Sequence, residues 1–364
     1  MKTKRIALAV LAAACCGAFP AAYADDGSSV IIYGYVRAGV DAMNGNANAV
    51  WGESASNARS STVNVAGRGE VNFRGVENLG NGLAAVFQVQ NEFSPTNATG
   101  YDDQHGTHSA GFASDDSYVG LKGGFGQLRL GKGTGNFEDG KYENTVIVGP
   151  DQMLGWFGDA LGNNMVRYDL PSFGAFNASI QYSTEENKSA SYNGTQHVSL
   201  GASYDVGRWG VSGAFASTGN AMVTDGSQVA VSATNQTTAF GWATNQGATG
   251  TLNQAHLTAM YKPTDSLQLV VELQRNTLAG DAQNKGALYG YYTMGSVQFG
   301  LQGGVQSYSG HKPSGLSNEK FVDGFVHYSL SKQTMVYLEA LQDKDGASGA
   351  GSRTFTVLGM VKNF

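Results

Sequence analysis

Apolar and polar residues alternate along much of this chain with a period of two. From residue 267 to 275 the odd positions are mostly leucine and valine, whereas Gln268, Glu272 and Gln274 occupy even positions. The segment 296–306 repeats the pattern with valine, phenylalanine and leucine opposite glutamine. Because successive side chains of a β-strand point to opposite faces, each segment predicts a strand with one apolar and one polar face. Soluble β-sandwiches alternate as well, so the connections must decide the class.

The connections between these segments fall into two classes that take turns along the chain. The short ones contain turn-forming residues and cover 78–82, 123–126, 171–174, 263–266 and 331–333. The long ones are polar and cover 42–62, 94–110, 133–163, 218–250 and 309–319. Short turns on one rim and long loops on the other, joining strands of about ten residues, are typical of transmembrane β-barrels.

The pattern predicts sixteen strands, with expected starts at residues 30, 64, 83, 111, 127, 164, 175, 195, 209, 251, 266, 286, 296, 320, 333 and 352. An even number places both chain ends on one rim, where the first and last strands can pair and close the sheet. The segment 218–250 could hold one more hairpin, so eighteen strands is the alternative. The predicted fold class is all-β, a closed antiparallel transmembrane β-barrel.

Residues 1–24 have the three-part layout of a secretory signal peptide. A basic start and an apolar stretch from residue 6 to 19 precede the cleavage pattern Ala22-Tyr23-Ala24. We expect cleavage after this pattern, which leaves 25–364 as the barrel. The alternative is a lipoprotein processing site at Cys15, but the residue three positions earlier is alanine and not the usual leucine.

Composition narrows the functional classes. Both cysteines, Cys15 and Cys16, lie in the segment expected to be removed, so the mature chain can form neither a disulfide nor a thiolate metal site. Loss of three basic residues leaves 20 Lys and Arg against 29 Asp and Glu, a net charge of −9, which argues against nucleic acid as a partner. Histidines and aspartates in 102–108 are interpreted as loop charges, so neither a metal nor a cofactor is expected.

Six segments spread over the chain carry a family resemblance. They are Ser-Ser-Val-Ile-Ile-Tyr-Gly at 28–34, Phe-Arg-Gly-Val-Glu-Asn-Leu-Gly-Asn-Gly-Leu at 73–83, Tyr-Val-Gly-Leu-Lys-Gly-Gly-Phe-Gly at 118–126, Val-Arg-Tyr-Asp-Leu-Pro-Ser-Phe-Gly at 166–174, Tyr-Ser-Leu-Ser-Lys at 328–332, and the terminal Phe364. Together they resemble the trimeric general porins of Gram-negative bacteria, in the neisserial and β-proteobacterial branch. The resemblance implies a sixteen-stranded homotrimer in contact with outer-membrane lipid and lipopolysaccharide, which passes ions and small hydrophilic solutes passively.

The resemblance also implies a constriction, formed where the third long loop folds into the lumen. That loop is 133–163, and its acidic residues are Glu138, Asp139, Glu143, Asp151 and Asp159. In such porins an acidic loop faces arginines on the barrel wall, and the resulting transverse field sorts solutes by charge. The alternative interpretation is that these acids are ordinary solvated loop charges.

The wall positions that the resemblance assigns depart from the family pattern. Where these porins have arginine, this chain has Glu70 and Asp115, and only Arg167 matches. Three more arginines on inferred lumen faces could restore part of the basic wall or could be rim charges: Arg37, Arg68 and Arg74. Because two arginines are replaced by acids, we predict a weak preference for cations.

Aromatic residues near the expected strand ends predict the interfacial girdles of a membrane barrel. They include Phe93, Tyr118, Tyr168, Tyr182, Trp209 and Tyr328. Phe364 ends the last strand on the apolar face and is assigned as a C-terminal assembly signal. The alternatives are a carbohydrate- or other solute-specific porin, with Tyr33 and Tyr35 in a stacking track, an adhesin, or an enzyme barrel. No Gly-x-Ser-x-Gly nucleophile motif supports an enzyme.

Overall fold

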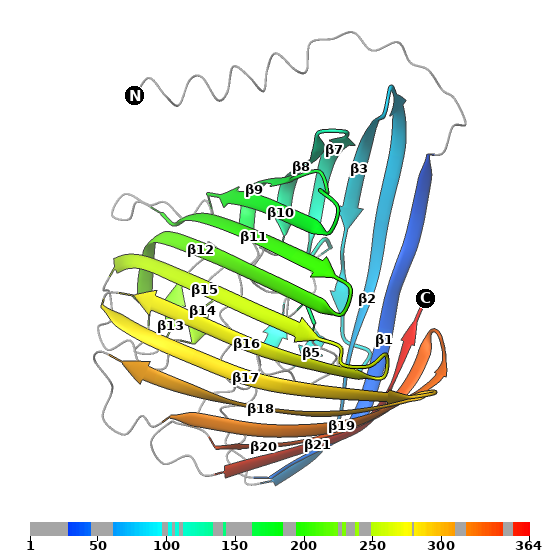
Figure 1. Cartoon of the computed structure of the whole chain (residues 1–364), viewed down its shortest axis with the longest axis vertical. Helices are drawn as coiled ribbons and strands as arrows, with labels where there is room; N and C mark the ends of the chain where they lie inside the picture. The colour runs from blue at the N-terminus through cyan, green and yellow to red at the C-terminus, as the bar shows by residue number, and fades with distance from the viewer. Residues whose placement is uncertain are drawn as a thin grey trace.

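The computed structural model describes residues 28–44, 61–96, 101–103, 106–108, 112–133, 141–142, 162–184, 194–224, 228–230, 237–239, 249–278, 280–309, 318–344 and 352–364. Sixteen antiparallel strands of these ranges form the wall of a barrel (Figure 1). They are β1 (Ser29–Asn44), β2 (Ser61–Gly80), β3 (Leu83–Val89), β7 (Ser117–Gly123), β8 (Gly126–Gly133), β9 (Gly162–Asp169), β10 (Phe176–Ser183), β11 (Gln196–Val206), β12 (Trp209–Thr224), β15 (Thr249–Tyr261), β16 (Leu267–Leu278), β17 (Asp281–Met294), β18 (Val297–Ser309), β19 (Glu319–Ser331), β20 (Thr334–Lys344) and β21 (Ser352–Asn363).

Five short strands accompany the wall. They are β4 (Glu92–Phe93), β5 (Tyr101–Asp103), β6 (Gly106–His108), β13 (Gln228–Ala230) and β14 (Thr237–Ala239). β4 continues the line of β3 along β2, while β5 and β6 form one small hairpin and β13 and β14 another. Within the described ranges, no helix is both long and apolar enough to cross a membrane.

The first and last strands pair and close the sheet. β1 lies between β2 and β21, and its pairing with β21 runs from Tyr35 opposite Asn363 to Asn44 opposite Thr354. At the end of this seam the backbone groups of Gly34 and Phe364 exchange hydrogen bonds of 3.1 and 3.0 Å. A closed sheet has no unpaired edge, which a membrane requires because lipid offers no hydrogen-bond partners. The predicted fold class is confirmed.

Tight turns gather on the rim that holds the two ends of the barrel chain. The turns after β2, β11 and β17 use Gly82, Gly207 and Gly295, whose φ angles of 76°, 57° and 60° lie in the left-handed region that glycine adopts without strain. Two-residue turns such as these hold neighbouring strands in register, and the rim with the short turns is the periplasmic one in outer-membrane barrels.

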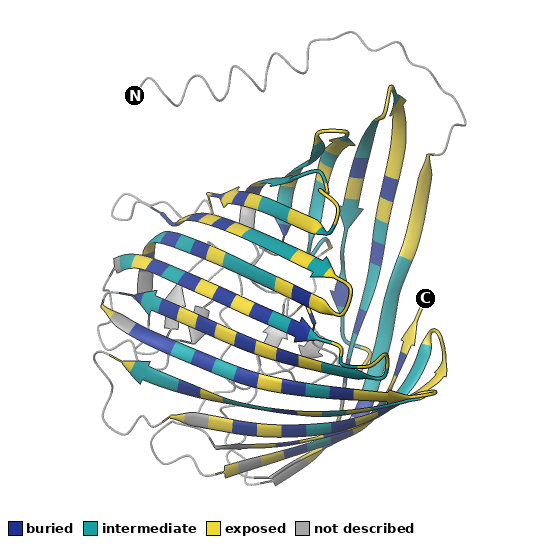
Figure 2. Ribbon diagram, in the orientation of Figure 1, coloured by how far each residue is buried: buried dark blue, intermediate teal, exposed yellow. Residues whose placement is uncertain are grey.

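The two faces of the wall differ as the alternation predicted. In β16, Leu269, Val271 and Leu273 are exposed on the outer face, whereas Glu272 and Gln274 on the inner face are buried. Figure 2 shows the same banding of buried and exposed positions along most strands. An apolar outer band suits lipid, and a polar inner face suits a water-filled lumen.

Part of the inner face of β18–β21 departs from this rule because it is apolar. Phe321, Phe325 and Tyr337 point inward and are nearly fully buried, at 6%, 3% and 1% exposure. The ring of Phe325 covers Gly300 and the ring of Tyr337 covers Gly359, because a Cβ at these glycines would lie 2.0 Å from Phe325 Cε1 and 2.4 Å from Tyr337 Cζ. The rings therefore lie along the wall and not across the lumen.

This inner apolar patch explains the poor alternation of the last strand. Phe355, Val357 and Val361 of β21 face inward and belong to the same buried cluster, while Leu358 and Met360 are exposed on the outer face. Both faces of β21 are apolar because one meets lipid and the other meets the patch.

Three details of the predicted strand plan are wrong. The fourth wall strand begins at residue 117 and not at 111, and the twelfth begins at residue 281 and not at 286. The alternative of eighteen strands also fails, because β12 and β15 pair directly and the described part of 218–250 contains, besides the ends of these two strands, only the three-residue strands β13 and β14. A strand that spans a membrane needs about 9–11 residues.

Candidate functional site

The pairing of β1 with β2 brings four of the sequence-predicted wall residues onto one inner face. Arg37 lies opposite Arg68, and the neighbouring inward pair is Tyr35 and Glu70. Arg74 follows two pairs further along β2, at an exposed position. Because inward positions recur every second residue, the strand alone places Arg68, Glu70 and Arg74 in one inward row.

Glu70 and Asp115 come together with a third acid, Glu92, which the sequence had not indicated. Glu70 and Glu92 pair directly between β2 and β4, and the carboxylate oxygens of all three residues lie within 4.8 Å of one another. Arg68 forms ion pairs with Glu70, at 3.5 Å, and with Glu92. We call Arg68, Glu70, Glu92 and Asp115 the acidic group. The group holds one guanidinium and three carboxylates, so it carries a net negative charge when all three carboxylates are ionised.

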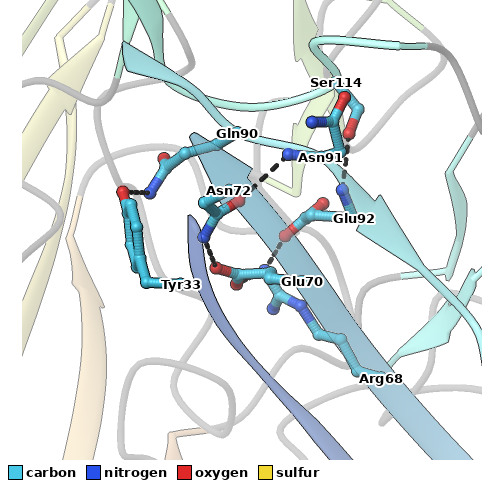
Figure 3. A network of polar contacts seen from close by, with 8 residues as sticks. All are labelled: Tyr33, Arg68, Glu70, Asn72, Gln90, Asn91, Glu92 and Ser114. Carbon is cyan, nitrogen blue, oxygen red and sulfur yellow. Dashed lines mark hydrogen bonds and ion pairs between the residues drawn. The ribbon is translucent and has the colours of Figure 1, made fainter. Parts of the chain in front are cut away.

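Asparagine side chains hold the backbone that carries the acidic group (Figure 3). Asn72 donates to Glu70 Oε2 at 3.0 Å and accepts from the Asn91 amide at 3.1 Å. Asn91 in turn donates to the Val71 carbonyl at 3.0 Å and accepts from the Ala113 amide at 2.6 Å. These bonds replace the regular ladder where the chain is irregular between β3 and β4, and they join it to the segment before β7.

Asp115 lies outside the strands but inside the field of the acidic group. Burial raises the pKa of this carboxyl above its ordinary value of 3.8, and the negative charge of Glu70 raises it further. Arg68 and Lys132 act in the opposite direction. The same three carboxylates could attract a divalent cation, but the Arg68 guanidinium already lies among them, which disfavours a metal site.

A second group of charges lies on β8 and β9. Arg129 and Arg167 pair across these strands and both bind Asp169, with Nε to carboxylate distances of 2.8 and 2.9 Å. Arg167 also donates to Ser179 at 3.3 Å. We call Arg129, Arg167 and Asp169 the basic group, because two guanidiniums share one carboxylate.

Two arginines of the wall lie over tyrosine rings. The guanidinium of Arg74 lies over the Tyr33 ring at 5.0 Å, and that of Arg129 lies over the Tyr118 ring at 4.9 Å. Tyr118 therefore faces inward, and its prediction as a girdle residue is wrong. Tyr33 is covered by an arginine and accepts a hydrogen bond from Gln90 at 3.4 Å, so its ring is not a free face for stacking sugars.

Between its two ends, the predicted constriction loop is described only at Lys141 and Tyr142. Its five candidate acids lie outside the described residues: Glu138, Asp139, Glu143, Asp151 and Asp159. The Lys141 ammonium and the Tyr142 hydroxyl both bind Asp205, and Gln268 donates to the Tyr142 carbonyl at 2.8 Å. Both partners are inward residues of the wall, so this part of the loop lies in the lumen.

Comparison with known proteins decides the family. A model of the family described as Gram-negative porin matches residues 7–348 of this chain. The chain belongs to the Gram-negative porin family. Its barrel is therefore that of an outer-membrane protein, and because this family consists of channels the enzyme-barrel alternative is set aside.

Curated relatives match this porin over part of its length. The major outer membrane protein P.IB of Neisseria meningitidis serogroup B is 32% identical over 172 residues, which cover 44% of this chain and 45% of the relative. The protein of the same name from Neisseria gonorrhoeae is 36% identical over 141 residues, 36% of each chain. The matched region thus spans less than half the length of these relatives.

Solved structures match the porin over nearly its whole length. An anion-selective porin from Comamonas acidovorans has a TM-score of 0.70 at 20% identity and covers 93% of this chain and 100% of that one. OmpF of Salmonella typhi, in complex with daunomycin, has a TM-score of 0.64 at 12% identity and covers 94% and 99%. At such identities the likeness shows the fold.

At the outer face of the porin, Phe364 lies where the sequence predicted. Its side chain is exposed beside those of Leu358 and Met360, and its ring fits against Gly34 of β1, where a Cβ would lie 3.1 Å from Cζ. Trp209, another predicted girdle residue, is exposed near the same rim and stacks on Tyr261 with 4.0 Å between ring centroids. Aromatic rings at this level match a membrane interface.

Sequence reasoning missed Glu92 and Arg129 of the porin. Arg129 had a usable signal, because Leu128 and Leu130 flank it in an expected strand and both point outward. Glu92 had none, because its place in the acidic group depends on the irregular step between β3 and β4.

Proposed function

We propose that this porin passes ions and small hydrophilic solutes by passive diffusion through a water-filled lumen, with a weak preference for cations. The observation that carries the proposal is the acidic group on the inner wall, where three carboxylates gather and one guanidinium pairs with two of them. By the family resemblance, Glu70 and Asp115 replace arginines that line the lumen of such porins. The change from positive to negative charge therefore lies along the route of permeating ions.

The size of this effect follows from simple electrostatics. A carboxylate about 5 Å from a passing ion contributes roughly 1 kcal/mol in water-like surroundings. That is about a fivefold change in local ion concentration. Screening with a Debye length of about 8–10 Å weakens the effect at physiological salt. The preference is therefore modest and depends on ionic strength.

Opposing charge keeps the preference weak. The basic group adds one net positive charge, and Arg37 and Arg74 add cationic side chains on the same wall. We assign the balance in favour of cations to the acids of loop 133–163, which are Glu138, Asp139, Glu143, Asp151 and Asp159. Lys141 and Tyr142 of this loop bind Asp205 on the inner wall, which supports a position of the loop in the lumen. A field between acids and arginines would orient permeating solutes.

The assembly proposed is a homotrimer embedded in outer-membrane lipid and lipopolysaccharide. Membership of a family whose members are typically trimeric supports it. The exposed apolar outer face of strands such as β16 supplies surface for lipid and for a second copy. Phe364 is proposed as the signal by which the assembly machinery recognises the last strand.

Reversal potentials of the purified trimer in a planar bilayer, under a potassium chloride gradient, test the function. We expect large conductance steps that arrive in threes and a potential of the cationic sign. Glu70→Gln combined with Asp115→Asn should move the potential toward anions, because two of the three carboxylates of the acidic group are lost.

The control for this experiment is Asp265→Asn, which removes one carboxylate from a periplasmic turn outside the lumen, where its side chain is 98% exposed. This variant should keep the potential of the native porin. Clear chloride selectivity of the native protein would overturn the cation preference, and the absence of any conductance would overturn the channel itself.

A further inference from the structure

Lys141 and Tyr142, two adjacent residues of loop 133–163, both bind the carboxylate of Asp205 on β11. Asp205 accepts a hydrogen bond from the Tyr142 hydroxyl at 2.7 Å through Oδ1 and pairs with the Lys141 ammonium through Oδ2. The ammonium also donates to Ser203 at 2.8 Å. Hydrogen bonds that involve a charged partner are roughly twice as strong as neutral ones. These partners are 63 and 64 residues apart in sequence, so tertiary structure alone joins them.

Packing holds Tyr142 from other sides. Tyr142 is 7% exposed and belongs to the same buried cluster as Met260 and Val270. Its ring lies against Gly210 of β12, where a Cβ would lie 2.6 Å from the hydroxyl and 2.8 Å from Cζ. Gln268 of β16 donates to its backbone carbonyl at 2.8 Å. Wall strands β11, β12 and β16 therefore each hold part of this residue.

The Tyr142 hydroxyl keeps its proton and so remains a hydrogen-bond donor. Burial raises the pKa of Tyr142 above its ordinary value of 10.0, and the hydrogen bond and negative charge of Asp205 raise it further. The phenol therefore stays protonated at any pH at which an outer-membrane protein works.

The contact with Asp205 lies across the lumen from β1 and β2 and close to the periplasmic rim. In the ring of sixteen wall strands β12 is the ninth, so it lies across the lumen from β1 and β2, which carry Arg37, Arg68 and Arg74. Asp205 is the last residue but one of β11 and Gln268 is the second of β16, so both adjoin periplasmic turns. Gly133, where the loop leaves β8, is at the opposite end of its strand.

We propose that Lys141, Tyr142 and Asp205 form an anchor that fixes loop 133–163 deep in the lumen, on the wall opposite the arginines of β1 and β2. Asp205, Gln268 and Gly210, whose missing side chain leaves room for the Tyr142 ring, are positioning residues, and the anchor sets how far the loop stands from those arginines. This inference rests on the proposed function, because it assigns to the loop the acidic side of the pathway.

The anchor can be released by substitutions that leave the barrel wall intact. Asp205→Ala removes the shared acceptor, whereas Tyr142→Phe removes one hydroxyl and keeps the ring against Gly210. The matched control is Asp265→Asn, which breaks the ion pair of 3.0 Å between Arg208 and Asp265 on the adjoining turns without touching the loop. Resistance of each trimer to sodium dodecyl sulfate shows that the barrel has folded.

The labelling rate of a single introduced cysteine measures how accessible the loop is to solvent. The expected mature chain has no cysteine, so Glu143→Cys, next to the anchor, gives one site for a membrane-impermeant maleimide. Adding Asp205→Ala should speed labelling about tenfold, the factor expected from loss of a charge-assisted hydrogen bond. Tyr142→Phe should give a smaller increase, and Asp265→Asn none. Unchanged labelling in folded Asp205→Ala would overturn the anchor.

Conductance supplies the second readout, with Glu143 restored. Asp205→Ala should raise open-channel noise and weaken the charge preference, because the loop is no longer held at one distance from the arginines. The two proposals fail differently: a chloride-selective native porin whose labelling still depends on Asp205 refutes the cation preference and keeps the anchor. A cation-selective porin with noise and labelling unaffected by Asp205→Ala refutes the anchor alone.

Discussion

At the residue scale, the lumen of this porin is organised by small sets of charges and not by an even lining. The acidic group carries surplus negative charge on β2 and β4, and the basic group carries surplus positive charge on β8 and β9. Buried or half-buried charges interact more strongly than solvated ones because fewer water molecules screen them. A substitution within either set should therefore affect permeation more than one on a rim.

Asp115 should give the porin a pH-dependent charge preference. Its raised pKa means that the carboxyl binds a proton more tightly in the folded barrel than in the unfolded chain, so it becomes neutral at a higher pH than ordinary aspartates do. As the pH falls, the cation preference should weaken before exposed carboxyls titrate, and the folded state should gain stability through the same step. Reversal potentials measured from pH 8 to pH 4 check this expectation.

Asp115→Asn is the informative comparison for the pH series. This variant should already show the weaker preference at neutral pH and should lack the first step of the pH profile. A profile identical to that of the native porin would mean that another group titrates in this range.

At the element scale, glycines determine how aromatic side chains lie on the inner wall. Phe325 of β19 faces inward opposite Gly300 of β18, and its ring occupies the space that a Cβ would take. Tyr337 of β20 does the same at Gly359 of β21. The strands can then carry large inward rings without narrowing the lumen, because each ring lies flat over a neighbour that has no side chain.

Gly300→Ala should destabilise the barrel and narrow its pathway. The new Cβ would lie 2.0 Å from Phe325 Cε1, so the ring must leave the wall and turn toward the lumen. Overpacking of this kind costs about 1–3 kcal/mol. We expect a lower unfolding temperature of the trimer in detergent and a smaller single-channel conductance.

A glycine on the outer face serves as the control for that substitution. Gly286→Ala places a Cβ 3.6 Å from Leu273, an ordinary contact on the lipid side of β17. It should change neither the unfolding temperature nor the conductance. Equal effects at both glycines would show that backbone freedom matters and the position of the Phe325 ring does not.

At the scale of the whole molecule, the barrel has two unlike sides. The wall from β1 to β9 carries the acidic group and the basic group, whereas the inner face of β16 to β21 combines the apolar patch around Phe321, Phe325 and Tyr337 with buried charged residues such as Glu272 and Glu339. Ions avoid apolar surface because they would lose hydration there. Permeating ions should therefore follow the charged side, between the wall arginines and the loop held by Asp205.

The last residue of the chain extends the seam that closes the whole sheet. Deletion of Phe364 removes the reciprocal backbone bonds to Gly34 and the ring that covers this glycine. We expect a lower yield of folded trimer in cells, measured as the fraction that resists unfolding in dodecyl sulfate at room temperature. Met360→Ala removes an apolar side chain from the same outer face but keeps the backbone pairing of the seam, and should assemble normally. An equal loss in both variants would contradict a special role for the terminus.

What the sequence determined by itself was local. Most expected strand starts lie within a few residues of the observed ones, as for β16 at 267 and β18 at 297, because a period of two and a glycine turn need no distant partner. The inward placement of Glu70 and its neighbouring arginines followed from the same alternation.

Tertiary structure decided everything that depends on which strands become neighbours and in what register. Glu92 joined Glu70 across β2 and β4, and the apolar inner face of β21 found a patch to pack against. Tyr142 reached Asp205 from 63 residues away. Alternation tells which face of a strand a residue occupies, but the partner across the sheet or the lumen depends on barrel closure, which no short segment encodes.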